Sequence, residues 1–189
     1  MQEVARMVWA ELDRLGIRNP WVVGHSLGGY VALAMTHERA SDVKGLVLFH
    51  SSPFSDSEER KAVREKVIRL VAEHGAEPFL ATFADGLFRE KSEPLEFFRS
   101  KLEGTSRDAV VAYAAIMRDR PDRTDTVRRF GGPILMIAGR GDRLVPLSVA
   151  QQTADLNPSV VVEVLENSAH AGMLEEPQAS AAVLMRHLH

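Results

Sequence analysis

The chain has 189 residues, which is enough for one domain with a sizeable core and leaves little room for a second full domain. Its formal net charge is −3, whereas a nucleic-acid partner favours a basic patch or stripe, so we expect no nucleic-acid partner. The absence of cysteine excludes disulfides, thiolate metal sites and cysteine nucleophiles.

The first predicted element is an amphipathic helix that Gly16 terminates. Its apolar residues recur at helical spacing: Val4, Met7, Val8, Leu12 and Leu15. The segment is charged throughout, which is not typical of a signal peptide, and no apolar run in the chain approaches the roughly 20 residues of a membrane-spanning helix. We therefore expect a cytoplasmic protein without a membrane partner.

Four short apolar runs are predicted to be buried strands, because they are rich in β-branched residues and end at turn residues. They are Trp21–Val23, Gly45–His50, Ile134–Gly139 and Val160–Leu165. Helical patterns follow from Leu27, from Pro146 to Leu156, and from Glu175 to about Leu188. Strands that alternate with helices predict an α/β fold with a mostly parallel sheet flanked by helices.

A helical segment of different character interrupts this alternation. We expect a single domain over residues 1–189, with core segments 1–51 and 127–189 and a helical insertion at about 52–126. Ser55 and Glu58 have the spacing of a capping box at the start of the insertion's first helix. Its phenylalanines form either its own small core or part of an apolar acyl pocket: Phe54, Phe79, Phe83, Phe88, Phe97 and Phe98.

A single serine lies between glycines where the first strand gives way to a helix. The residues Gly24-His25-Ser26-Leu27-Gly28 match G-x-S-x-G, which in this context predicts a nucleophile elbow. Such a strained turn needs small residues two positions before and two after the serine. The helix N-terminus favours negative charge, so the backbone N–H of Leu27 is predicted to be an oxyanion donor. The alternative is a glycine-rich turn with a solvent-facing serine.

A serine hydroxyl needs a base, and the best candidate is His170. It lies in the loop "NSAHAG", at the carboxyl end of a predicted strand, where parallel sheets place their chemistry. His25 is too close to the serine along the chain to be the base, and His50 ends the second strand, where it could face the site. The other histidines lie on helices or at helix ends and are expected to be exposed: His37, His74, His187 and His189. The alternative for His170 is an exposed loop histidine.

Asp142, just past the third strand, is the predicted carboxylate that orients the base. The glycines of "GRGD" allow its loop to turn back toward the strand ends. Glu163 and Glu166 are alternatives, and Asp142 could instead be a turn aspartate. The order Ser26, Asp142, His170 is that of α/β-hydrolases and differs from the orders in chymotrypsin and subtilisin. No metal-ligand cluster or phosphate loop is evident, so we expect no metal and no cofactor.

The sequence resembles the α/β-hydrolase superfamily, in its serine-hydrolase branch with a helical cap. Three segments carry the resemblance: "VVGHSLGGYVAL", "PILMIAGRGDRLVP" and "LENSAHAGMLEEP". The resemblance implies that Ser26 is the nucleophile, Asp142 the acid and His170 the base, with the N–H of Leu27 in the oxyanion hole. It implies hydrolysis of a small-molecule ester or related acyl compound through an acyl-enzyme. It points away from the dehalogenases and epoxide hydrolases of this fold, whose nucleophile is aspartate.

We expect His25, His50 and Phe54 to contact the substrate. In the family, further strands precede the nucleophile strand, and a loop after one of them supplies a second oxyanion N–H. Residues 1–16 match only the helix before the nucleophile strand. We therefore expect those strands to be missing and the activity to be weak, since loss of one oxyanion donor costs on the order of 10²–10³ in rate in a serine protease.

The strand near Trp21–His25 would then lie at the edge of the sheet. An apolar strand edge invites association, so we expect a homodimer in which two such edges pair about a two-fold axis. The leading hypothesis is a serine esterase. The alternatives are a catalytically weak or inactive hydrolase-like module whose main property is self-association, and a ligand-binding protein that uses the cap pocket.

Overall fold

The computed structural model describes residues 1–188 and divides the chain into two compact units. The first unit combines Met1–Phe54 with the chain from Asp122 onward, and the second comprises Ser55–Pro121. Among the described residues, every helix is too short or too polar to span a lipid bilayer.

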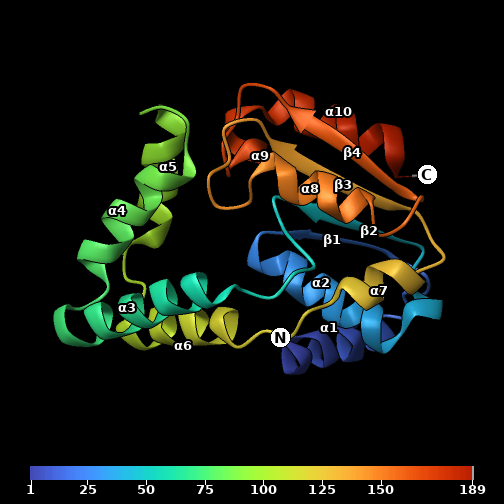
Figure 1. Cartoon of the computed structure of the whole chain (residues 1–189), viewed down its shortest axis with the longest axis horizontal. Coiled ribbons are helices and arrows are strands. Elements are labelled where there is room, and N and C mark those ends of the chain that lie inside the picture. Colours follow the sequence, from blue (N-terminus) through green and yellow to red (C-terminus); the bar gives the residue numbers. More distant parts are fainter. Residues whose placement is uncertain (189) are drawn as a thin grey trace. The chain divides into compact units, whose positions relative to one another are not determined.

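The first unit is built on a four-stranded parallel sheet (Figure 1). Its strands lie in the order β1 (Trp21–His25), β2 (Gly45–Phe49), β3 (Ile134–Gly139) and β4 (Val160–Leu165). The register places Val23 opposite Val47, and Ile137 opposite Glu163. The α/β fold predicted from the alternation of strands and helices is therefore confirmed, and each predicted strand is found within two residues of its expected ends.

Helices cover both faces of this sheet (Figure 1). One face carries α1 (Gln2–Arg14), α2 (Leu27–Glu38), α7 (Thr124–Arg129) and α8 (Leu147–Ala154). The other carries α9 (Gly172–Glu175) and α10 (Pro177–His187), and a 3-10 turn, η1 (Ala40–Asp42), precedes β2. Successive β2 side chains alternate between the two cores, with Leu46 on the α2 side and Val47 on the α10 side. Burial on both faces explains why β2 and β3 are continuously apolar.

Helix α1 forms where predicted, but a different face of it is buried. Ala5 and Trp9 are buried and Leu12 packs against the same core, while the indole N–H of Trp9 donates to the carbonyl of Met35 at 3.2 Å. The remaining apolar residues of the predicted stripe are exposed: Val4, Met7, Val8 and Leu15. The periodicity of α1 was compatible with two apolar faces, and packing against α2 selects the one that carries the tryptophan.

The second unit consists of four helices, in which α3 packs against α6. They are α3 (Glu58–His74), α4 (Glu77–Leu87), α5 (Glu93–Leu102) and α6 (Arg107–Arg118). The predicted capping box at Ser55 is wrong, because Ser57 is the N-cap and its hydroxyl accepts the N–H of Arg60. Buried Asp56 pairs with Arg120 at 2.8 Å, which joins the two ends of the unit.

The phenylalanines of this unit mostly pack on one another and on its apolar residues. Phe79 stacks on Phe83 at 5.5 Å, and Phe88 lies 5.7 Å from Phe98, whereas Phe97 is exposed. The unit also contains a cavity of about 720 Å³ near the start of α4 and the end of α5. Its lining includes charged side chains and none of these phenylalanines, so it differs from an apolar acyl pocket.

The two faces of α1 should differ in their contribution to stability. We expect Trp9→Ala to lower the free energy of unfolding by about 3–5 kcal/mol, because it removes a buried aromatic ring and a hydrogen bond. Met7→Ala, on the exposed face, is the matched control and should change it by less than about 0.5 kcal/mol. Urea denaturation measures both, and equal effects would contradict the assigned orientation of α1.

Candidate active site

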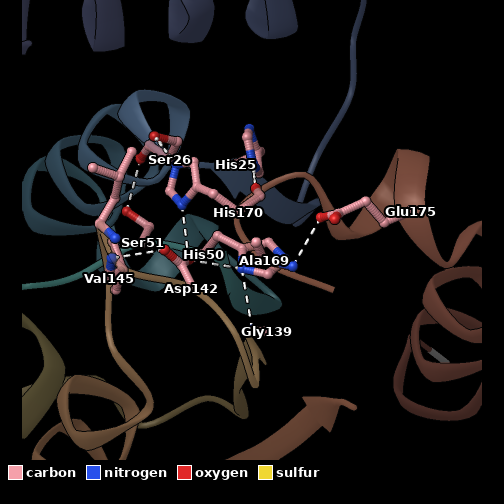
Figure 2. Close-up of polar contacts among 11 residues, drawn as sticks. His25, Ser26, His50, Ser51, Gly139, Asp142, Val145, Ala169, His170 and Glu175 are labelled. Carbon is pink, nitrogen blue, oxygen red and sulfur yellow. Dashed lines mark hydrogen bonds and ion pairs between the residues drawn. The ribbon is translucent and has the colours of Figure 1, made fainter. Parts of the chain in front are cut away.

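Four polar side chains follow the four strands at one end of the sheet. Ser26 comes directly after β1, His50 directly after β2, Asp142 three residues after β3 and His170 five residues after β4. Because all four strands are parallel, their carboxyl ends meet at the same edge, where α/β sheets place their ligands. Figure 2 shows the four side chains converging there.

Ser26 lies on a sharp turn between β1 and α2. Its φ of +49° and ψ of −115° are unusual for a residue with a side chain, and it is the N-cap of α2. Two hydrogen bonds from the end of β2 stabilise this backbone: the N–H of Ser26 donates to the carbonyl of Phe49 at 2.9 Å, and the Ser51 hydroxyl donates to the carbonyl of Ser26 at 2.7 Å. The strand–turn–helix geometry expected from G-x-S-x-G is present.

Of the two glycines predicted to make room for the serine turn, one is required and the other is not. A Cβ on Gly24 would lie 2.3 Å from the carbonyl oxygen of Gly28, so this position requires glycine. A Cβ on Gly28 itself would meet nothing within 4 Å, whereas one on Gly29 would lie 2.2 Å from the Ser51 hydroxyl. The turn therefore depends on Gly24 and Gly29, and the expectation that Gly28 is needed for space is wrong within this chain.

A continuous hydrogen-bond chain joins the serine to the acid through His170. The Ser26 hydroxyl lies 2.8 Å from Nε2 of His170, and Nδ1 of the same ring lies 2.8 Å from Oδ2 of Asp142 (Figure 2). Since the carboxylate can only accept, Nδ1 carries the proton and Nε2 is free to accept from the serine. His170 and Asp142 are both buried, in contrast to the alternative of an exposed loop histidine.

The carboxylate of Asp142 is satisfied on both oxygens. Its Oδ1 accepts the backbone N–H groups of Leu144 and Val145, each at 2.9 Å, and its Oδ2 accepts from His170 at 2.8 Å and lies 3.0 Å from Nδ1 of His50. Burial by itself raises the pKa of Asp142, but the hydrogen bonds from the two histidines outweigh it and hold the pKa well below its usual range. Asp142 therefore stays ionised beside His170.

His25 contacts the backbone of the base. Its Nε2 lies 2.8 Å from the carbonyl of His170, and because a carbonyl only accepts, this nitrogen carries the proton. Burial lowers the pKa of His25 to about 4, although the same carbonyl opposes the shift. A neutral His25 thus holds the loop of His170, a contact that motif reasoning does not reveal because the two residues are distant in sequence.

Carboxylates from the start of the C-terminal helical region fix the rest of the base loop. The N–H of Ala169 donates to Glu175 at 2.8 Å, and the N–H of Asn167 donates to Glu176 at 2.8 Å (Figure 2 shows the first). Glu175 belongs to α9, five residues after His170. Its side chain points back toward the loop that carries His170 and stabilises that loop. In the sequence, these two contacts are visible only as two adjacent acidic residues near a helix start, in the segment "LEEP".

The structure places the other predicted site residues in several environments. Leu27 is the first residue of α2, so its N–H has no acceptor within the helix. His50 is buried beneath Asp142, and Phe54 is half-buried, with its N–H donating to the Ser52 hydroxyl. The alternative acids pair elsewhere, Glu163 with His187 and Glu166 with Arg140. His189 lies outside the described residues.

One group of side chains in residues 1–188 has the ligand spacing of a metal site: His50, Asp142 and His170. The two histidines direct their Nδ1 atoms at the same carboxylate oxygen, at distances of 3.0 and 2.8 Å. Those separations are hydrogen-bond lengths, and a metal ion would have to displace the protons that make them. The donor set therefore fits a hydrogen-bonded acid better than a metal centre.

A parallel α/β sheet that carries a strained serine turn and a hydrogen-bonded serine–histidine–aspartate chain at the carboxyl ends of its strands is a combination found in hydrolases. Residues 1–177 match the model of the alpha/beta hydrolase fold family, and the chain belongs to that family.

Individual proteins that are similar to the chain are also hydrolases. The chain is 30% identical to RutD of Stutzerimonas stutzeri, named as a carbamate hydrolase, over 94% of this chain and 69% of that protein. It is 27% identical to the pimeloyl-[acyl-carrier protein] methyl ester esterase of Vibrio vulnificus, over 95% of this chain and 72% of that protein. It superposes on a thermophilic esterase from Thermogutta terrifontis with a TM-score of 0.89 and 25% identity, over 100% of this chain and 72% of the esterase. These relatives support hydrolase activity in general.

The low pKa of His25 makes stability depend on pH. In the unfolded chain this histidine takes up a proton near its ordinary pKa of 6.5, whereas in the folded protein it stays neutral down to about 4. Between these values the unfolded state binds more protons, so stability falls as the pH falls, by up to about 1.4 kcal/mol per unit. The stability that the Asp142 carboxylate contributes is lost only below the ordinary aspartate pKa of 3.8, outside this window.

His25→Gln should reduce this slope, since glutamine removes the titrating group and keeps an N–H for the carbonyl of His170. Chemical denaturation at several pH values between about 4.5 and about 7 measures the slope. His74→Gln, at an exposed position, is the control. An unchanged slope in the His25 variant would contradict the assignment.

Proposed function

We propose that the chain is a serine esterase that cleaves a small carboxylic ester or a related acyl compound through an acyl-enzyme. The hydrogen-bond chain from Ser26 through His170 to Asp142, with both links at 2.8 Å, carries the proposal. A serine alone would be a weak nucleophile, and this chain supplies both the base and the group that orients it. Esterases among the relatives support the same chemistry.

In the acylation half, the Ser26 oxygen attacks the substrate carbonyl carbon as its proton moves to Nε2 of His170. The carbonyl oxygen becomes an oxyanion, and the Asp142 carboxylate stabilises the imidazolium that forms. The tetrahedral intermediate then collapses, the ester C–O bond breaks, and the imidazolium gives its proton to the departing alkoxide. The products of this half are an alcohol and a serine ester.

In the deacylation half, water replaces the alcohol. His170 removes a proton from water as its oxygen attacks the serine ester, and the collapse of the second intermediate returns that proton to Ser26. The carboxylic acid leaves and the enzyme is regenerated. A carbamate ester also has a carbonyl carbon bonded to a leaving oxygen, so cleavage of that C–O bond would follow the same steps and release a carbamic acid in place of the carboxylic acid.

The backbone N–H of Leu27 is the proposed oxyanion donor. It is the first N–H of α2, so both its free hydrogen and the positive end of the helix favour charge on the substrate oxygen. Leu27 supplies one donor, and removal of one such donor lowers the rate of a serine protease by a factor on the order of 10²–10³.

Ser26 should be the site of acylation. A fluorophosphonate probe is expected to label it stoichiometrically, and Ser26→Ala should abolish labelling and lower turnover of short p-nitrophenyl esters by about 10⁴-fold or more. Ser41→Ala, which removes an exposed hydroxyl that donates to Asp42, is the matched control and should leave both unchanged. Labelling of the folded protein elsewhere than Ser26 would sink the proposal.

We also propose that the chain self-associates along β1. Self-association would be the main property of the chain if it is a catalytically weak or inactive hydrolase-like module. Among the described strands β1 pairs only with β2, which leaves its other edge unpaired. Its Val23 is 48% exposed, and several apolar residues of α1 are exposed as well. A second copy related by a two-fold axis would pair the two edges antiparallel and extend the sheet.

The proposal predicts a dimer in analytical ultracentrifugation at micromolar concentration. Val23→Lys should shift the protein to monomer, because two lysines would face each other across the axis. Val161 lies on β4 at the opposite edge and is 45% exposed, so Val161→Lys is the matched control and should stay dimeric. A wild-type protein that sediments as a monomer, or equal behaviour of the two variants, would disprove the proposal.

A further inference from the structure

One buried histidine beside the acid has no part in the proposed reaction steps. His50 follows β2 with a φ of +49°, and its side chain has no exposed area. Its Nδ1 lies 3.0 Å from Oδ2 of Asp142, the same oxygen that His170 reaches at 2.8 Å (Figure 2). Asp142 thus holds two histidines on one oxygen, and only one of them contacts the serine.

The proton on His50 can be placed by the charges around it. Its Nδ1 also lies 3.2 Å from the backbone N–H of Gly139, which can only donate. A ring nitrogen cannot accept from this N–H and donate to the carboxylate at once. An unprotonated Nδ1 would direct its lone pair at an ionised carboxylate, which is the less favourable arrangement. We therefore assign the proton to Nδ1, with Asp142 as its acceptor.

The surroundings of the His50 ring hold it in place. The ring stacks on Phe49 at 4.9 Å, and two glycines make room for it: a Cβ on Gly139 would lie 2.9 Å from Cε1, and one on Gly172 would lie 2.6 Å from Nε2. The same added Cβ on Gly172 would lie 3.2 Å from the buried Ser168 hydroxyl. Nε2 of His50 and the Ser168 hydroxyl are both buried, and neither has a hydrogen-bond partner among the described residues, so the tautomer is assigned from the Nδ1 side of the ring.

We propose that His50 is a positioning residue that aligns the acid and divides its charge between two histidines. This inference rests on the proposed serine-esterase function. With the proton on Nδ1, His50 fixes Oδ2 of Asp142 from the β2 side while the N–H groups of Leu144 and Val145 fix Oδ1. Because Oδ2 shares its charge between two donors, its attraction to the protonated form of His170 is weaker than with a single donor.

Several charged or titratable groups face His50 from neighbouring elements. Asp142 lies on the loop after β3, His170 and Glu175 belong to the region after β4, and His25 is at the end of β1, with its ring centroid 5.8 Å away. Of these groups only Asp142 is hydrogen-bonded to the His50 ring, so a change at position 50 acts on the acid first.

The tautomer of His50 gives a test that needs no turnover. In ¹⁵N-histidine-labelled wild-type protein near neutral pH, long-range ¹H–¹⁵N correlation spectra should show His50 protonated at Nδ1, and His50→Asn identifies its signals by their loss. Protonation at Nε2 alone would overturn the inference, because Nδ1 could then not donate to Asp142.

Two variants of similar shape test the effect on catalysis. Asparagine at position 50 keeps an N–H at the same number of bonds from the backbone as Nδ1 and tolerates a positive φ, whereas leucine has the same branching without a donor. We expect His50→Leu to lower kcat about tenfold, leave KM within about twofold, and move the acid limb of the pH–rate profile up by about one unit. His50→Asn should restore most of kcat and the wild-type profile.

The outcomes separate the two proposals. If turnover of the wild type does not depend on Ser26, the proposed esterase function fails. The NMR spectra would still show whether His50 donates a hydrogen bond to Asp142. If turnover depends on Ser26 but the leucine and asparagine variants share one pH profile and one kcat, the role of His50 fails alone. Stoichiometric labelling of Ser26 in both variants would show that the site remains folded.

Discussion

The buried charge of Asp142 is the constraint on which the geometry of the site depends. A carboxylate without solvent is costly unless hydrogen bonds satisfy it, and this one accepts four. Two donors come from its own loop, one from the residue after β2 and one from the loop after β4. A single ionised group therefore ties together the ends of three neighbouring strands and sets the orientation of His170.

Burial also keeps the surrounding histidines neutral. His25 and His50 both have lowered pKa values, chiefly because their rings are removed from water. Neutral rings can serve as hydrogen-bond donors beside Asp142 and the carbonyl of His170 without adding positive charge. Three histidines at one edge of the sheet thus differ in function: one contacts the serine, and two fix the groups around it.

The serine turn depends equally on close packing between neighbouring strands. Its backbone is strained, and the hydrogen bonds that hold it come from Phe49 and Ser51 at the end of β2. Gly29 leaves the space that the Ser51 side chain occupies. A feature that reads in the sequence as a local motif is therefore maintained by the adjacent strand, and the order of the strands in the sheet is part of what positions the nucleophile.

The sequence by itself determined the α/β class, the four strands and the residues at their carboxyl ends, because these follow from periodicity, turn residues and short motifs. Ser26, Asp142 and His170 were identifiable for that reason, although their catalytic role stays a proposal. Tertiary structure decided which face of α1 is buried, which glycines the elbow requires, and that His25 and His50 lie against the base and the acid. These features arise from contacts between residues far apart in the chain, and no local pattern encodes such contacts.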